Sequence, residues 1–289
     1  MTMVVFASLK GSPGVTTLAS LVGATWPVDR RVVLTECDSF GGDLAPRFSL
    51  STRTGWSSLV GAARRGGPDP QVDAHLQTLP GGLEVLVAAA GRDSSPSTQS
   101  AWHAAEQAVI RFSNVTDVIV DHGRLPGTEP TSSPWLHNAT DVCLVVRNDP
   151  ASIVHVRDRS AEIRTQTKGS VRIVLVGAGI YSPSEVRDFT GLDVVAQIPE
   201  DRESASVVST GRGSHRRLER SGLVAAAGRL TTAMSSGVVG DDSPSKPGRE
   251  IDDRGSGRKG GFGRRSKGEI ADRRLVADRE PDEPVANIR

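Results

Sequence analysis

Residues Val4–Thr17 read VVFASLKGSPGVTT, and the fold expected for the whole chain depends on this stretch. The apolar run Val4–Phe6 predicts a strand, and the apolar residues after the two threonines have the spacing of a helix. A glycine-bearing turn between a strand and a helix can bind phosphate, because backbone N–H groups and the helix N-terminus converge on one anion. Gly11 and Gly14 permit the tight backbone of such a loop, and the hydroxyl of Thr16 stands where a phosphate loop places a Mg²⁺ ligand.

The loop departs from the standard pattern G-x-x-x-x-G-K-[ST], because Leu9 replaces the first glycine and Val15 replaces the lysine. It keeps Lys10, and the resulting K-G-x-x-G-x-T-T resembles the deviant Walker A loop of the MinD/ParA family of P-loop ATPases, a family of the SIMIBI class. The resemblance implies ATP and Mg²⁺ as cofactors and a homodimer in which Lys10 reaches the nucleotide of the partner subunit. It also implies that the nucleotide is bound by Gly11, Ser12, Pro13, Gly14, Val15, Thr16 and Thr17.

Short apolar runs alternate with longer helical patterns over residues 1–235, which we expect to form one domain. The predicted strands are Met3–Ala7, Arg31–Thr35, Leu83–Ala88, Asp117–Asp121, Val142–Val146, Val171–Val176 and Asp193–Gln197. The predicted helices are Thr17–Ala24, Gln99–Arg111, Ile153–Thr165, Pro183–Phe189 and His215–Met234, whereas Ser51–Gln71 reads as a long exposed connection. This alternation predicts an α/β fold: a doubly wound, mostly parallel sheet with helices on both faces.

Carboxylates follow two of the predicted strands, at the edge where such sheets bind ligands. Asp38 matches the family's aspartate that positions the attacking water, and the resemblance therefore implies a catalytic role for Asp38 and Lys10. A solvated carboxylate at a strand end is the alternative reading of Asp38. Asp121 ends an apolar run as a Walker B aspartate does, which predicts that Thr16 and Asp121 hold Mg²⁺. We interpret the neighbouring His122 as a loop histidine rather than a general base, because phosphoryl transfer depends mostly on positioning.

The segment Ile198–Asp201, sequence IPED, resembles the turn that follows the last core strand of MinD-like proteins and lies near the base and ribose. The resemblance implies that Pro199, Glu200 and Asp201 contact the nucleotide; a proline turn before an acidic helix start explains the same residues. Gly177 stands where the family often supplies an asparagine that reads adenine. The sequence therefore leaves open whether the nucleotide is ATP.

Composition narrows the location of the protein and the role of its last residues. A formal net charge of +1 points to neither nucleic acid nor membrane, and the two cysteines lie in apolar, strand-like settings. We expect a cytoplasmic protein, with a peripheral position at the inner face of the membrane as the alternative. Residues 236–289 are rich in Gly, Arg and Asp and poor in apolar residues, which predicts a disordered tail. Its basic residues around Phe262 suggest contact with nucleic acid or anionic lipid, but a solvated linker is favoured.

Two functions fit these patterns best. The first is a MinD/ParA-like positioning protein for a septum site, a replicon or a secretion or pilus machine, which acts with a protein partner through a nucleotide-favoured dimer. Val15 predicts weak or absent ATP hydrolysis in such a protein, because the loop lysine normally neutralises the β- and γ-phosphates. The alternative is a non-hydrolysing scaffold on the same fold, similar to the TadZ/CpaE localisation factors. A nucleic-acid binder that acts through the basic tail is a third, less supported function.

Overall fold

The computed structural model describes residues 1–11, 13–65, 70–88, 96–125, 133–210 and 213–236. Contacts divide the chain into two units, Met1–Asp241 and Asp242–Arg289. All elements given below belong to the first unit. The predicted tail, including the basic residues around Phe262, lies outside the described residues from position 237 onward, so its predicted disorder stays a prediction.

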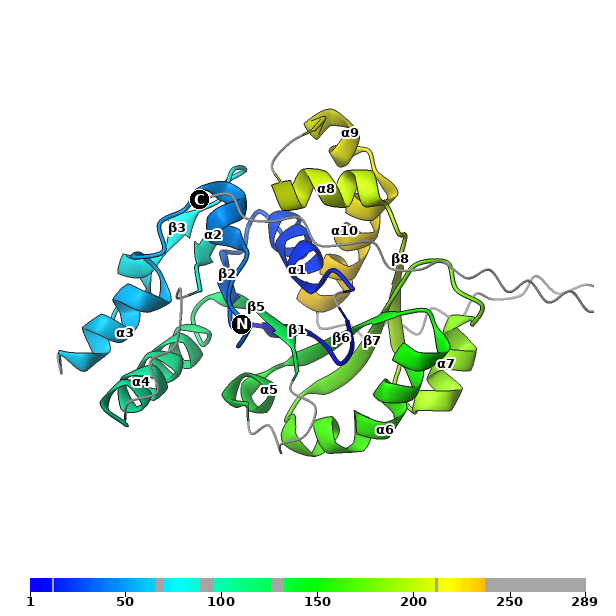
Figure 1. Ribbon diagram of the computed structural model, residues 1–289, viewed down its shortest axis with the longest axis horizontal. Coiled ribbons are helices and arrows are strands. Elements are labelled where there is room, and N and C mark those ends of the chain that lie inside the picture. The colour runs from blue at the N-terminus through cyan, green and yellow to red at the C-terminus, as the bar shows by residue number, and fades with distance from the viewer. Residues whose placement is uncertain (12, 66–69, 89–95, 126–132, 211–212, 237–289) are drawn as a thin grey trace, which may run out of the picture. The chain divides into compact units, whose positions relative to one another are not determined.

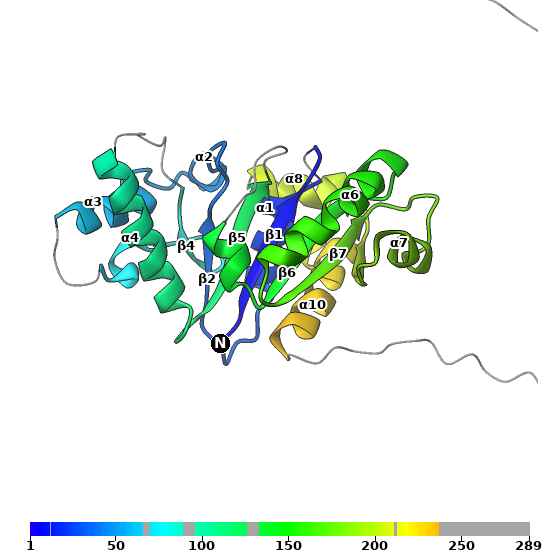
Figure 2. The same cartoon turned by 90° about the horizontal axis from the view of Figure 1, so that it is seen from below.

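An eight-stranded sheet forms the centre of the first unit, with the order β3-β4-β2-β5-β1-β6-β7-β8 (Figures 1 and 2). Its strands are β1 (Met3–Ser8), β2 (Val32–Glu36), β3 (Gln77–Thr78), β4 (Glu84–Leu86), β5 (Asp117–Arg124), β6 (Asp141–Arg147), β7 (Ser170–Val176) and β8 (Val194–Ile198). All neighbouring strands run parallel except β3 and β4, which are antiparallel. The predicted fold class is therefore confirmed.

Helices cover both faces of this sheet (Figure 1). One face packs against α1 (Val15–Ala24), α2 (Leu44–Phe48), α8 (Arg202–Thr210) and α10 (Gly222–Ser235), which follows the short α9 (His215–Glu219). The other face packs against α3 (Trp56–Arg64), α4 (Pro96–Phe112), α5 (Pro134–Asn138), α6 (Pro150–Gln166) and α7 (Pro183–Thr190), and a 3-10 helix spans Val72–His75. Among the described residues, no helix is both long and apolar enough to cross a membrane.

The central strand β1 shows why the sequence adopts this layered fold. Val4 and Phe6 pack into the core on the α1 side, whereas Met3, Val5 and Ala7 pack into the core on the opposite side, and all five are buried. Side chains alternate between the two faces of a strand, so a strand that is apolar at every position must be covered on both faces. This burial fixes β1 in the middle of the sheet and places the loop that follows it at the carboxyl edge.

Two sequence predictions about helices are wrong. The stretch Ser51–Gln71 contains α3, which forms because Trp56, Leu59 and Val60 recur on one face and are buried; Trp56 also stacks on another tryptophan at a centroid distance of 5.5 Å. The single helix predicted at His215–Met234 is two helices, α9 and α10. The chain is extended between them at a serine whose side chain caps α10. Helices α2 and α5 were not predicted, and α8 begins where the sequence allowed an acidic helix start after Pro199.

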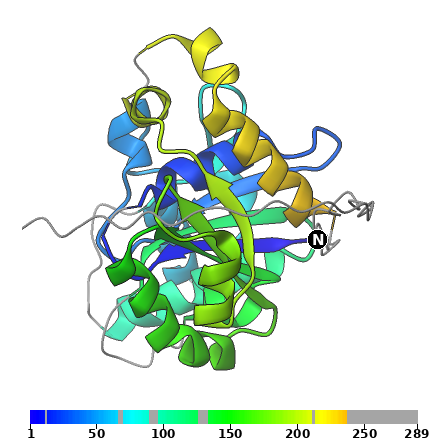
Figure 3. The same cartoon turned by 90° about the vertical axis from the view of Figure 1, so that its right-hand side faces the viewer.

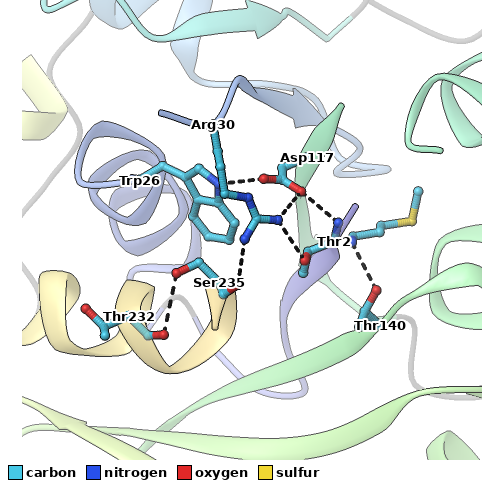
Figure 4. Close-up of polar contacts among 8 residues, drawn as sticks. Thr2, Trp26, Arg30, Asp117, Thr140, Thr232 and Ser235 are labelled. Atoms are coloured by element: carbon cyan, nitrogen blue, oxygen red, sulfur yellow. Dashed lines mark hydrogen bonds and ion pairs between the residues drawn. The ribbon is translucent and has the colours of Figure 1, made fainter. Parts of the chain in front are cut away.

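A buried ion pair joins distant segments at the amino edge of the sheet (Figure 4). Figure 3 shows that the N-terminus and the end of α10 both lie at this edge. Asp117, at the start of β5, is fully buried and accepts hydrogen bonds from Thr2 N at 2.7 Å, Trp26 Nε1 at 2.9 Å and Arg30 Nη2 at 2.6 Å. The same guanidinium donates through Nη1 to the carbonyl of Ser235 at the end of α10, at 2.5 Å. We call these five residues the amino-edge clasp. It ties both ends of the described domain to the sheet, on the edge opposite the glycine-bearing loop.

Candidate functional site

The loop after β1 has the backbone that its glycines predict. Gly11 has φ 66° and Gly14 has φ 97°, both in the left-handed region that favours glycine. Apart from its chain neighbours, no atom of the described residues lies within 4 Å of the place a Cβ would take at either glycine, so both border open space. Helix α1 begins directly afterwards at Val15, and Gly14, its N-cap residue, has no side chain to cap it. The N–H groups of the first turn are thus available to an anion. Ser12 lies outside the described residues.

Val15, which the resemblance places among the nucleotide-binding residues, has a buried side chain. Only 6% of Val15 is exposed, and the side chain packs into the core on the α1 side of the sheet. Its backbone N–H, in the first turn of α1, is the only group it offers to a ligand there. The hydroxyl-bearing residues that follow, Thr16 and Thr17, are half-buried at the start of the helix.

Asp121 lies beside the start of α1, where the sequence predicts a Mg²⁺ ligand. It is 2% exposed; the hydroxyl of Thr16 donates a hydrogen bond to its carboxylate, and Gly123 N donates to its Oδ1 at 3.1 Å. Burial raises the pKa of Asp121 from 3.8 to about 7, and the nearby carboxylates of Glu36 and Asp38 add to this increase. The structure therefore brings together Thr16 and Asp121, which the sequence analysis paired as metal ligands.

Asp38 lies at the same edge, in the connection that leaves β2. Its Oδ1 accepts a hydrogen bond from Phe40 N at 2.8 Å, and burial is the main reason that its pKa is raised above the ordinary value. A Cβ on Gly123 would lie only 1.8 Å from Asp38 Oδ2. Glycine at position 123 is what lets this connection approach β5 so closely, so Asp38 is packed against the site rather than freely solvated.

Glu36, the last residue of β2, fastens the connection on which Asp38 lies. Its Oε1 accepts the N–H groups of Asp43 at 2.7 Å and Leu44 at 2.8 Å, and its Oε2 accepts Ala88 N at 3.0 Å. Burial is the main reason that the pKa of this carboxyl group is raised. The sequence shows that a glutamate follows the apolar run of β2, but not that its carboxylate accepts hydrogen bonds from three backbone N–H groups.

A cavity of about 270 Å³ joins the glycine-bearing loop to the IPED segment. It is lined by Pro13, Gly14, Thr17, Leu18, Arg147, Val176, Ile198, Pro199, Glu200, Asp201, Arg202, Ala205 and Leu223. The residues predicted near phosphate and those predicted near the base and ribose therefore border one cavity, although some 180 positions separate them in the chain. Asp201 also caps α8, since it accepts the N–H of Ser204 at 2.9 Å, so the structural reading of that residue holds as well.

Lys10 is exposed at this edge and has an acidic neighbour within its own chain. Burial alone would raise the pKa of Asp149, but hydrogen bonds from Ser152 and the charge of Lys10 lower it below its ordinary value. Asp149 in turn caps α6 by accepting Ser152 N at 2.9 Å. The charge of Lys10 thus acts on the acidic cap of α6 within the single subunit, which the sequence did not suggest.

The residues at this edge fit Mg²⁺ and a phosphate-bearing ligand. Thr16 and Asp121 offer hard oxygen atoms, which Mg²⁺ prefers, and Mg²⁺ sites commonly use one or two carboxylates together with substrate phosphates and water. No group of three or more His, Cys, Asp or Glu residues within the described ranges is arranged to hold a metal by itself. Phosphate oxygens and water would therefore complete the coordination.

A doubly wound α/β sheet with a glycine-bearing loop between its central strand and a helix is the fold of phosphate-loop domains. Comparison with solved structures narrows this class further. The chain is similar to the MinC:MinD cell division complex of Aquifex aeolicus (18% identity, 86% of this chain and 99% of that chain covered, TM-score 0.62). It is also similar to a ParA family ATPase of Chlorobium tepidum (16% identity, 79% of this chain and 98% of that chain covered, TM-score 0.62). A third similar structure is Pyrococcus horikoshii MinD complexed with Mg-ADP (17% identity, 80% of this chain and 94% of that chain covered, TM-score 0.60).

The chain therefore has the fold of the MinD/ParA ATPases, and at the level of the fold these comparisons confirm the resemblance read from the sequence. No protein-family model and no curated protein sequence matches the chain. The roles assigned to Lys10, Asp38, Asp121 and the loop residues stay predictions.

Proposed function

We propose that this protein is a MinD/ParA-like, nucleotide-binding positioning protein that acts through a nucleotide-favoured dimer, with weak or no ATP hydrolysis. The observation that supports the proposal most strongly is the buried carboxylate of Asp121, hydrogen-bonded to Thr16 at the uncapped start of α1. A buried carboxylate destabilises the fold unless a proton or a cation neutralises it. Bound Mg²⁺ would offset the cost of burying this carboxylate, so a nucleotide site with Mg²⁺ explains why a carboxylate is buried here.

Each part of the site has a task in this proposal. The N–H groups of the loop and the first turn of α1 bind the phosphates, and Thr16 and Asp121 hold Mg²⁺, which neutralises phosphate charge. Pro199–Asp201 border the part of the cavity that takes the base and ribose. Asp38 orients a water molecule. Loss of a preorganised positive group typically costs about 3–4 kcal/mol in the transition state, a few-hundredfold in rate, so Val15 predicts slow turnover.

Val15 also favours a second candidate function, a non-hydrolysing scaffold similar to TadZ/CpaE, because it leaves the β- and γ-phosphates without the loop lysine. Both functions need a protein partner, and one similar structure is that of MinD in complex with MinC. Both also suit a cytoplasmic protein that works at the inner face of the membrane. A single-turnover assay separates them, because a positioning ATPase releases phosphate from bound ATP, however slowly, and a scaffold releases none.

Replacing Lys10 tests the proposed dimer. We expect ATP and Mg²⁺ to shift wild type toward a dimer in sedimentation velocity, and Lys10→Ala to abolish the shift, because the exposed lysine would bind the nucleotide of the partner subunit. Lys168→Ala is the matched control, since Lys168 is an exposed lysine just before β7, at the opposite edge of the sheet. Identical species with and without nucleotide in all three proteins would contradict the proposed dimer.

A further inference from the structure

Three acidic side chains gather beside the loop that we propose binds phosphate. Glu36 ends β2, Asp38 follows it, and Asp121 lies near the end of β5; each of these groups has a raised pKa. A bound triphosphate would add negative charge at the same place, while Val15 leaves the loop without its usual lysine. A further cation close to the loop would reduce this repulsion.

A β-bulge in β5 determines which side chain of that strand lies beside the glycine-bearing loop. Where β5 pairs with β1, Phe6 lies opposite Asp121 and Ser8 lies opposite Arg124, so two steps along β1 match three along β5 and His122 is the extra residue. In a regular strand, residues three apart point to opposite faces. The extra residue brings Arg124 back to the face of Asp121, which is the face that Phe6 shares with α1.

Arg124 is also held close to the loop and to Asp38. Leu125 N donates to Ser8 O at 2.8 Å, which fixes Arg124 beside the last residue of β1. Its guanidinium carbon lies 4.8 Å from the centroid of the Phe40 ring, and Phe40 is 70% exposed. The charge and the backbone N–H of Arg124 both favour the ionised form of Asp38, although burial raises the pKa of that group overall. An exposed guanidinium is thus placed among the acidic groups at the mouth of the loop.

We propose that Arg124 contacts the terminal phosphate of a nucleoside triphosphate bound at this loop, and that Phe40 is a positioning residue that holds the guanidinium there. The inference rests on the proposed function, because it requires a nucleotide in the site. A guanidinium matches phosphate with two parallel N–H groups, so Arg124 supplies from β5 the positive charge that Val15 does not supply from α1. A guanidinium that lies over a ring still donates in its own plane, so the contact with Phe40 leaves its N–H groups free for phosphate.

Isothermal titration calorimetry with Mg²⁺, using the non-hydrolysable triphosphate AMPPNP and the diphosphate ADP, tests this contact. We expect wild type to bind AMPPNP more tightly than ADP. Arg124→Gln should weaken AMPPNP binding about 10- to 100-fold, as expected for the loss of charge-assisted hydrogen bonds, and change ADP binding less than about twofold. Arg124→Lys should restore part of the loss, and Phe40→Leu should weaken AMPPNP selectively and by less than Arg124→Gln.

Arg187→Gln is the matched control, because Arg187 is an exposed arginine on α7, and we expect it to keep the wild-type ratio of the two affinities. If wild type binds neither nucleotide, the proposed function and this inference both fail. If wild type binds both nucleotides and Arg124→Gln keeps the wild-type ratio, this inference alone fails. Should Arg124→Gln not fold, an unchanged ratio in both Arg124→Lys and Phe40→Leu would overturn it.

Discussion

Replacing Asp117 with alanine is expected to lower the free energy of unfolding by about 3–5 kcal/mol, because the change leaves the Arg30 guanidinium half-buried without its partner. The fully buried carboxylate also accepts hydrogen bonds from Thr2 N and Trp26 Nε1, and both donors would lose their acceptor (Figure 4). The amino-edge clasp holds the start of β1 and the end of α10, so its loss weakens both ends of the domain. Urea denaturation followed by circular dichroism measures the effect.

Asp73→Ala provides the matched control for this prediction. Asp73 also forms an ion pair with an arginine, Arg31, at the same N–O distance of 2.6 Å, but the side chains of Asp73 and Arg31 are both about half exposed. Exposed pairs typically contribute about 0–1 kcal/mol, so we expect little change. Equal losses of stability in the two variants would mean that burial does not decide the strength of the clasp.

The second large effect is expected at the candidate site, where Asp121→Asn should stabilise the ligand-free protein near neutral pH. The pKa of Asp121 is raised from 3.8 to about 7, so between these values the folded protein keeps a proton that the unfolded chain has lost. The stability of wild type therefore falls as pH rises through this window. A difference of about three pKa units, at about 1.4 kcal/mol each, lowers the free energy of unfolding of wild type by about 4 kcal/mol above pH 7. Asparagine does not ionise, so the variant does not lose this stability.

Chemical denaturation of both proteins from pH 4 to pH 8 measures this difference. The two curves should lie close together at pH 4 and separate progressively up to pH 7, and the exposed Asp29→Asn should follow wild type throughout. Added ATP and Mg²⁺ should stabilise wild type at pH 8 but not Asp121→Asn, which lacks the charge that would hold the metal. Parallel curves for wild type and Asp121→Asn over the whole range would contradict this account of the buried carboxylate.

The layered fold could be predicted from local patterns, because strands covered on both faces are apolar at successive positions, as β1 is. Helix α3 was missed although Trp56, Leu59 and Val60 have helical spacing, since the glycines, arginines and prolines around them dominate the composition of that stretch. The break between α9 and α10 was missed for another reason. Ser221 is a good N-cap, but nothing local shows that the chain must begin a new helix there.

The candidate site could be predicted only as far as its residues follow strand ends. Asp38 and Asp121 were singled out in this way, and Thr16 by its position in the glycine-bearing loop; the roles of all three stay predictions. The buried side chain of Val15 was not predicted, because a valine in a loop and a valine in a core look alike in the sequence. Arg124 was also missed, since its place on the sheet depends on a register shift between two strands more than a hundred residues apart. Register is a property of tertiary pairing, which no local pattern in this chain reports.

Calorimetric titration of ATP into the full chain, with and without Mg²⁺, shows whether the loop at Gly11–Thr17 is a nucleotide site. We expect saturable binding of one nucleotide per chain that is tighter with Mg²⁺. We also expect loss of the Mg²⁺ effect in Thr16→Val, which keeps the shape of the side chain and removes the hydroxyl. Absence of any binding by wild type at millimolar nucleotide would contradict a nucleotide site at this loop and leave the scaffold as the function that the fold supports.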